Sequence, residues 1–200
     1  MNRNTLRQYV NLLVAVATII FNGLANALPL NGQNTGQISD RFHVYFVPAG
    51  YVFSIWGVIY IGWLAFAIYQ LLPTQRDNPR IQQVGYLFAL SGIANMAWLF
   101  FWHYEYFVLT VMVMLILLLL LIAIYLRLQI GKVQVAPLER WCVDIPFSVY
   151  LGWISGDNCQ HHRSFELFAL GWMGYQSRSM DALNANGGCL YRFSRKSDAR

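Results

Sequence analysis

The sequence predicts an all-α protein of the polytopic membrane class, a bundle of five transmembrane helices in which the fifth helix is incomplete. Only 12% of the residues are charged and 57% are hydrophobic, whereas soluble domains carry about a quarter charged residues. Four uncharged runs each reach the roughly 20 residues that cross a bilayer as a helix. A lone span in lipid must be helical, because its backbone groups find no water to bond. The runs place four spans at about 9–30, 51–72, 82–102 and 106–126, followed by a shorter segment at 142–155.

The first span could be mistaken for a secretory signal, since Arg3 and Arg7 precede its apolar core. Its apolar region is too long for a signal, and Asn22 and Asn26 stand where a small-residue cleavage site belongs. We therefore expect a retained span. The two asparagines are four residues apart and share one helix face, which predicts that they turn toward other helices.

The second span is marked by aromatic residues at helical spacing. Phe53, Trp56, Tyr60 and Trp63 follow one another at steps of three, four and three, which places their rings on one face. Such spacing is more often ordinary packing than a ligand box, and the sequence leaves both interpretations open.

The third and fourth spans are joined by a tight turn over 103–105, so they must be antiparallel neighbours. In the third span, Gly92 and Ala94 permit close helix contact. Asn95 and Trp98 are three residues apart and face one way. An amide inside a membrane must find a partner, either another helix or a ligand.

The fifth segment begins as a span, with Asp144 expected at the interface beside Arg140, and becomes too polar after Ser155. Residues 1–155 are therefore predicted to form the helical bundle, and residues 156–200 an aberrant or disordered basic tail. Reading the codons of residues 156–193 one nucleotide later allows apolar residues at most positions. A frameshift after Ser155 is our hypothesis for the tail.

Several function classes are disfavoured. The first four spans contain no charged residue, which argues against ion pumps and proton-coupled transporters. The basic residues are scattered through loops, which argues against nucleic acid as a partner. Cys159, His161 and His162 lack a second ligand pair, so no metal site is expected. We expect no catalytic residue and no required cofactor, because phosphate-binding, dinucleotide and nucleophile-elbow motifs are absent from the sequence.

The loop charges predict the orientation. Two basic residues precede the first span, two follow the second and three follow the fourth, whereas Arg41 stands alone on the other side. The positive-inside rule then places the N-terminus of this multi-pass protein in the cytoplasm.

The motifs in the second, third and fifth segments together resemble the TspO/MBR family, the tryptophan-rich sensory proteins related to the mitochondrial translocator (peripheral benzodiazepine) receptor. The family's Pro-Pro-x-Trp-Val-Phe start, with a later Trp and Tyr, is approached by PAGYVFSIWGVIY at 48–60. Its Asn-x-x-Trp matches Asn95 and Trp98, and its later Pro and Trp are similar to Pro146 and Trp153. The second Pro and the first Trp of the start are replaced by Ala49 and Tyr51.

The resemblance implies a five-helix bundle, often a homodimer, with a pocket beneath the loop between the first two spans. It implies binding of a planar hydrophobic ligand, either a tetrapyrrole such as porphyrin or haem or a sterol-like molecule, for sensing or transport. Porphyrin breakdown is the minor enzymatic alternative, and a structural or assembly module of a membrane complex without a small-molecule ligand is the other. The expected ligand-binding residues are Tyr51, Phe53, Trp56, Tyr60, Asn95, Trp98, Pro146 and Trp153.

Overall fold

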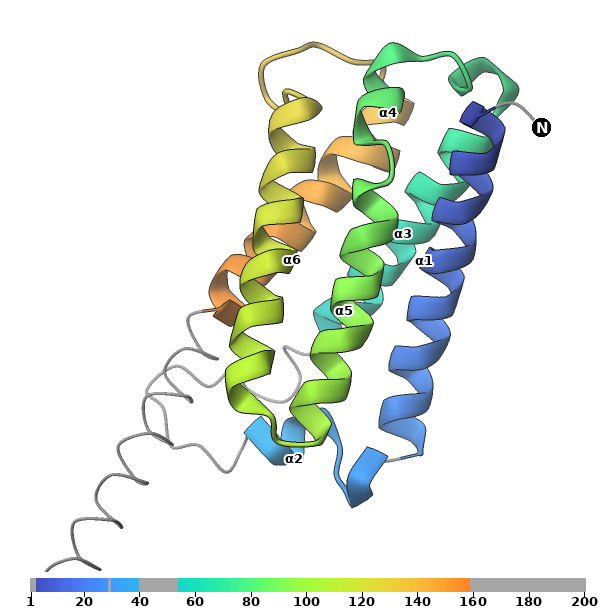
Figure 1. Cartoon of the computed structure of the whole chain (residues 1–200). Helices are drawn as coiled ribbons and strands as arrows, with labels where there is room; N and C mark the ends of the chain where they lie inside the picture. Colours follow the sequence, from blue (N-terminus) through green and yellow to red (C-terminus); the bar gives the residue numbers. More distant parts are fainter. Residues whose placement is uncertain (1–2, 29, 40–53, 159–200) are drawn as a thin grey trace, which may run out of the picture.

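The structure, a computed structural model, describes residues 3–28, 30–39 and 54–158, and every regular element in these ranges is helical (Figure 1). The prediction of an all-α fold is confirmed for these residues. The elements in chain order are α1 (Arg3–Ala27), η1 (Leu30–Gly32), α2 (Thr35–Ser39), α3 (Ile55–Leu71), η3 (Pro73–Gln75), α4 (Pro79–Val84), α5 (Leu87–His103), α6 (Phe107–Arg127), α7 (Pro137–Glu139) and the π-helical turn η4 (Arg140–Asp144). A further helix covers residues 145–158.

The long helices run alternately up and down and give the bundle two ends (Figure 1). One end, here called the α2 end, holds α2 and the turn between α5 and α6. The other, the α4 end, holds the start of α1, α4 and the loop that follows α6. Helices α5 and α6 are antiparallel neighbours, as the tight turn between them predicted.

Two of the described helices are long and apolar enough to cross a membrane. They cover Asn4–Ala27 (24 residues) and Phe107–Arg127 (21 residues). Helices Ile55–Leu71 and Leu87–His103 are also apolar but shorter, at 17 residues each.

The side chains of α1 are distributed as expected for a helix that meets lipid. Its buried side chains include Gln8, Asn11 and Asn22, whereas Leu13 is 71% exposed and Ile20 is 55% exposed. A helix in water would bury the leucine and expose the amides. In a bilayer the reverse arrangement is favourable, because buried amides can bond across helices while leucine meets acyl chains.

The segment expected at 82–102 is divided in the structure between α4 and α5. Asn78 caps α4 by accepting a hydrogen bond from the Arg80 backbone N–H at 3.0 Å, and Pro79 occupies the first turn. Gly85 then adopts φ 58°, a left-handed conformation that ends α4. The apolar helix therefore starts at Leu87, five residues later than expected.

The last helical segment contains a wide turn just before Pro146. The Ile145 N–H bonds to the Arg140 carbonyl, five residues back, instead of the usual four. Proline lacks an N–H and crowds the preceding turn, and a π turn accommodates that crowding. Pro146 faces Gly62 of α3, where an added Cβ would lie 2.9 Å from the proline Cβ. The described helix extends to residue 158, and most of the expected aberrant tail, 159–200, lies outside the described residues.

An ion-pair cluster joins α4 to the last helical segment at the α4 end. Arg80 donates to Glu139 at 2.6 Å and to Asp144 at 2.5 Å, and its Nε donates to the Leu128 carbonyl at 2.9 Å. Burial alone would lower the pKa of Arg80, but its hydrogen bonds to the two carboxylates raise that pKa above its ordinary value. Asp144, expected at the interface beside Arg140, thus has Arg80 of α4 as its ion-pair partner.

Candidate functional site

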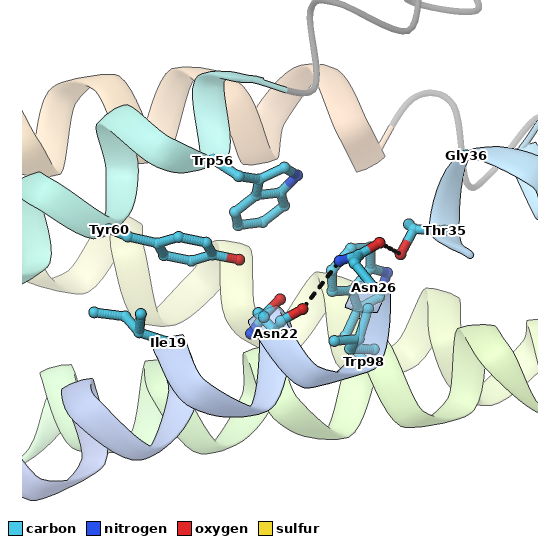
Figure 2. A pocket seen from close by; sticks show the side chains of 10 residues that line it. Ile19, Asn22, Asn26, Thr35, Gly36, Trp56, Tyr60 and Trp98 are labelled. Carbon is cyan, nitrogen blue, oxygen red and sulfur yellow. Dashed lines mark hydrogen bonds between the residues drawn. The ribbon is translucent and has the colours of Figure 1, made fainter. Parts of the chain in front are cut away.

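A cavity of about 420 Å³ lies between α1, α3 and α5 near the α2 end (Figure 2). Its volume falls within the roughly 300–1,000 Å³ of small-molecule pockets. Its walls combine aromatic rings, aliphatic side chains and a few amide and hydroxyl groups. The described lining residues are Ile19, Asn22, Gly23, Asn26, Thr35, Gly36, Trp56, Tyr60, Trp98 and Leu99.

The aromatic wall is organised around Trp56. Its ring stacks on Trp98 with centroids 5.6 Å apart and planes at 21°, and on Tyr60 at 5.8 Å and 29°. Tyr150 and Trp153 of the last helix meet the Trp56 ring edge-on at 6.3 Å and 6.2 Å. Stacked and edge-on rings stabilise one another at these separations, so these contacts hold the Trp56 ring in place.

The aromatic face of α3 serves two purposes along its length. Trp56 and Tyr60, near the α2 end, line the cavity. One turn further on, Trp63 is 2% exposed and packs edge-on against Phe88 at 5.4 Å and Tyr150 at 5.2 Å. The aromatic residues of α3 therefore line a cavity at one turn of the helix and pack in the core at the next.

A chain of buried polar groups runs behind the cavity wall. Asn22 of α1 donates to Oδ1 of Asn95 at 2.9 Å, and Asn95 donates to the Tyr150 hydroxyl at 3.3 Å. Asn95 and Tyr150 are fully buried, and Asn22 is 4% exposed. The two bonds join α1, α5 and the last helix, which satisfies amides that would be costly to bury alone.

Hydrogen bonds to α5 close the α2 end of the cavity. The Thr35 hydroxyl lies 3.1 Å from Nε2 of His103 and 3.3 Å from Oδ1 of Asn26. Nδ1 of His103 lies 3.2 Å from the Leu30 carbonyl, and Trp102 donates to the Thr35 carbonyl at 3.3 Å. These contacts hold η1 and the start of α2 against the end of α5.

The expected site residues fall into three groups. Trp56, Tyr60 and Trp98 line the cavity. Asn95 and Trp153 contact the cavity wall, where Asn95 bonds to Asn22 and Trp153 meets the Trp56 ring, whereas Pro146 packs against Gly62 and does not line the cavity. The two remaining residues, Tyr51 and Phe53, lie outside the described residues.

Several site residues were not among those expected from the sequence. Asn22 and Asn26 had a signal, since two amides on one face of an apolar helix indicate inward-facing groups. Thr35 and His103 had none, because they come together only when the chain between α1 and α2 folds over α5. His103 is 1% exposed, although it is a polar residue at the end of α5.

The lining restricts what the cavity can hold. None of the ten described lining residues carries a charge, and burying an unpaired ion is costly. Among the described residues, no group of three or more His, Cys, Asp or Glu could hold a metal. The arrangement suits a flat, mostly apolar molecule with a few hydrogen-bonding atoms.

The described residues form an all-helical bundle that buries amide groups, exposes leucine and isoleucine side chains and contains a cavity lined by aromatic rings. These features are those of a small integral membrane protein. The family model of TSPO-like proteins matches residues 8–176. The chain thus belongs to the TspO/MBR family, and it is a membrane protein of the TspO type whose environment is the lipid bilayer. The matched region extends beyond Ser155 into the tail. No match was found among curated proteins or among solved structures.

Proposed function

We propose that this protein binds a planar hydrophobic ligand in the cavity between α1, α3 and α5. The stacked rings of Trp56, Trp98 and Tyr60 are the observation that carries the proposal. They offer a flat apolar face beside a volume of about 420 Å³. The ring of Trp56 is already held by its neighbours. Binding a ligand against it therefore costs the protein little conformational entropy.

The family resemblance supplies the ligand class and the role. A tetrapyrrole or a sterol-like molecule would be bound for sensing or transport, by a receptor that crosses the bilayer five times and pairs as a homodimer. Helices α1, α3, α5, α6 and the segment over 137–158 are the five spans of this proposal.

The charge distribution supports a cytoplasmic N-terminus. The described Lys and Arg residues all lie at the α4 end: Arg3, Arg7, Arg76, Arg80, Arg127, Lys132 and Arg140. Basic residues beside transmembrane segments are retained on the cytoplasmic side. In this orientation the cavity lies toward the opposite face of the membrane.

Replacing Trp56 by leucine tests ligand binding. We expect added protoporphyrin to quench the tryptophan fluorescence of the wild type, and its affinity for Trp56→Leu to fall about tenfold, since a ring contact worth about 1.4 kcal/mol is lost. Fluorescence titration of the full chain in lipid nanodiscs measures both constants.

Trp141→Leu is the matched control, because Trp141 of η4 is 69% exposed and does not line the cavity. Its affinity should equal that of the wild type. Wild-type protein that shows no saturable quenching would instead support the alternative of an assembly module without a small-molecule ligand.

A further inference from the structure

The amide of Asn22 is held in one orientation at the cavity wall. Its Nδ2 donates one hydrogen to Oδ1 of Asn95 at 2.9 Å and the other to the Thr18 carbonyl, also at 2.9 Å. Both hydrogens of the amide are therefore committed to the protein. The remaining polar atom of this side chain is the oxygen, which can only accept.

The Thr18 carbonyl excludes the opposite orientation of the amide. If the Asn22 amide were flipped, its oxygen would lie against that carbonyl, and two acceptors would face each other without a hydrogen. The Asn95–Tyr150 contact alone would not decide the matter, because the Tyr150 hydroxyl can donate or accept. The backbone of α1 thus fixes which end of the Asn22 amide meets the cavity.

The Asn22 oxygen is open to the cavity. Within the part of the chain that the structure describes, no donor bonds to it, and it is not among the side-chain atoms buried without a partner. The Tyr60 hydroxyl likewise has no hydrogen-bond partner among the described residues and is not fully buried. In Figure 2 the Asn22 side chain and the Tyr60 hydroxyl point toward each other across the space beside the Trp56 ring.

The other amide of this wall differs from Asn22. Asn26 donates to the Asn22 carbonyl at 3.0 Å, and its Oδ1 lies 3.3 Å from the Thr35 hydroxyl, which can donate to it. Both ends of its amide therefore lie against polar groups of the protein, although the single hydrogen of the Thr35 hydroxyl is shared with Nε2 of His103 at 3.1 Å. Of the two amides in the described lining, Asn22 is the one whose oxygen has no hydrogen-bond partner among the described residues.

We propose that the cavity selects ligands whose buried ring system carries a polar N–H or O–H hydrogen, and that Asn22 is the residue that determines this specificity. The inference rests on the proposed function, since it concerns the same cavity. An acceptor that is stripped of water and left unpaired by the ligand weakens binding. The portion of the ligand inside the cavity is neutral, because none of the described lining residues could pair with a charge.

Two ligands that differ by one donor test the inference without changing the protein. Carbazole is a flat, neutral three-ring molecule with a single N–H, and 9-methylcarbazole replaces that hydrogen with a methyl group. Equilibrium dialysis against the full chain in lipid nanodiscs, corrected by empty nanodiscs, gives both dissociation constants. We expect carbazole to bind about tenfold more tightly, the value of roughly one hydrogen bond at a desolvated acceptor.

Variants then assign the preference to Asn22. Asn22→Leu should bring the ratio of the two constants close to one, and Asn22→Ala should do the same if the leucine variant does not fold. Asn11→Leu is the matched control, because Asn11 is a buried α1 amide that bonds to Gln70 and Gly85 away from the cavity. It should keep the wild-type ratio.

The outcomes separate this inference from the proposed function. Equal binding of the two carbazoles, or a ratio unchanged in the Asn22 variants, overturns donor selection and leaves ring binding intact. Binding of neither carbazole while protoporphyrin still quenches also overturns the inference alone. Binding of neither carbazole and no quenching by protoporphyrin removes the proposed function, and the inference with it.

Discussion

Arg80→Leu should lower the free energy of unfolding by about 3–5 kcal/mol, the cost of breaking a buried ion pair from one side. Arg80 bonds to Glu139 and Asp144, and the side chains in each pair are only 14% and 11% exposed. Removing the guanidinium leaves two carboxylates close together without a cation. It also leaves the Leu128 carbonyl without its side-chain donor.

Thermal unfolding in detergent, followed by circular dichroism, measures the loss. Arg76→Leu is the matched control, since Arg76 is an exposed arginine in the same loop, and it should unfold near the wild-type temperature. Adding Glu139→Gln and Asp144→Asn to Arg80→Leu should recover part of the stability, because the unpaired charges are removed. Equal unfolding temperatures for Arg80→Leu and the wild type would show that the cluster contributes nothing.

Gly62→Ala should destabilise the bundle by about 1–3 kcal/mol, the usual cost of inserting a methyl group into a packed interface. The new Cβ would lie 2.9 Å from Cβ and 3.2 Å from Cγ of Pro146. A proline ring cannot rotate away, so the last helix must move off α3. That movement would disturb the Tyr150 and Trp153 contacts behind Trp56.

Gly57→Ala is the matched control for Gly62→Ala, because Gly57 lies in the same helix and an added Cβ there meets nothing within 4 Å. It should be neutral or slightly stabilising, since alanine favours helix over glycine. If the two alanine variants melted at the same temperature, the close approach of Gly62 to Pro146 would not hold the last helix in place.

Most of the helices could be predicted because the length of an uncharged run can be read directly from the local sequence. The span expected at 106–126 and α6 (Phe107–Arg127) differ by one residue at each end. The division at Gly85 was missed because Val84, Gly85 and Tyr86 are all uncharged, and hydropathy does not register a positive φ. The fifth segment was expected to begin at Cys142, whereas the helical segment begins at Pro137, before the π turn. The charged residues Glu139 and Arg140 interrupt the uncharged run there.

The site could be predicted only in part, because its residues meet through tertiary contacts. Helical spacing placed Trp56 and Tyr60 on one face, but it could not show that Trp63 on the same face would be covered by Phe88 and Tyr150. Asn95 was expected to bond either a helix or a ligand, and the structure gives it Asn22. That pairing depends on the register of α1 against α5, which no local pattern encodes.

The most direct test that the ligand binds in the cavity is to fill the cavity with a larger side chain on α1. Gly23 lines the cavity, and an added Cβ there would meet nothing within 4 Å. Gly23→Phe should therefore fold and melt like the wild type while its saturable protoporphyrin quenching disappears. Gly152→Phe, at a glycine equally free of neighbours and outside the lining, should bind normally. A folded Gly23→Phe protein with wild-type affinity would contradict binding in this cavity.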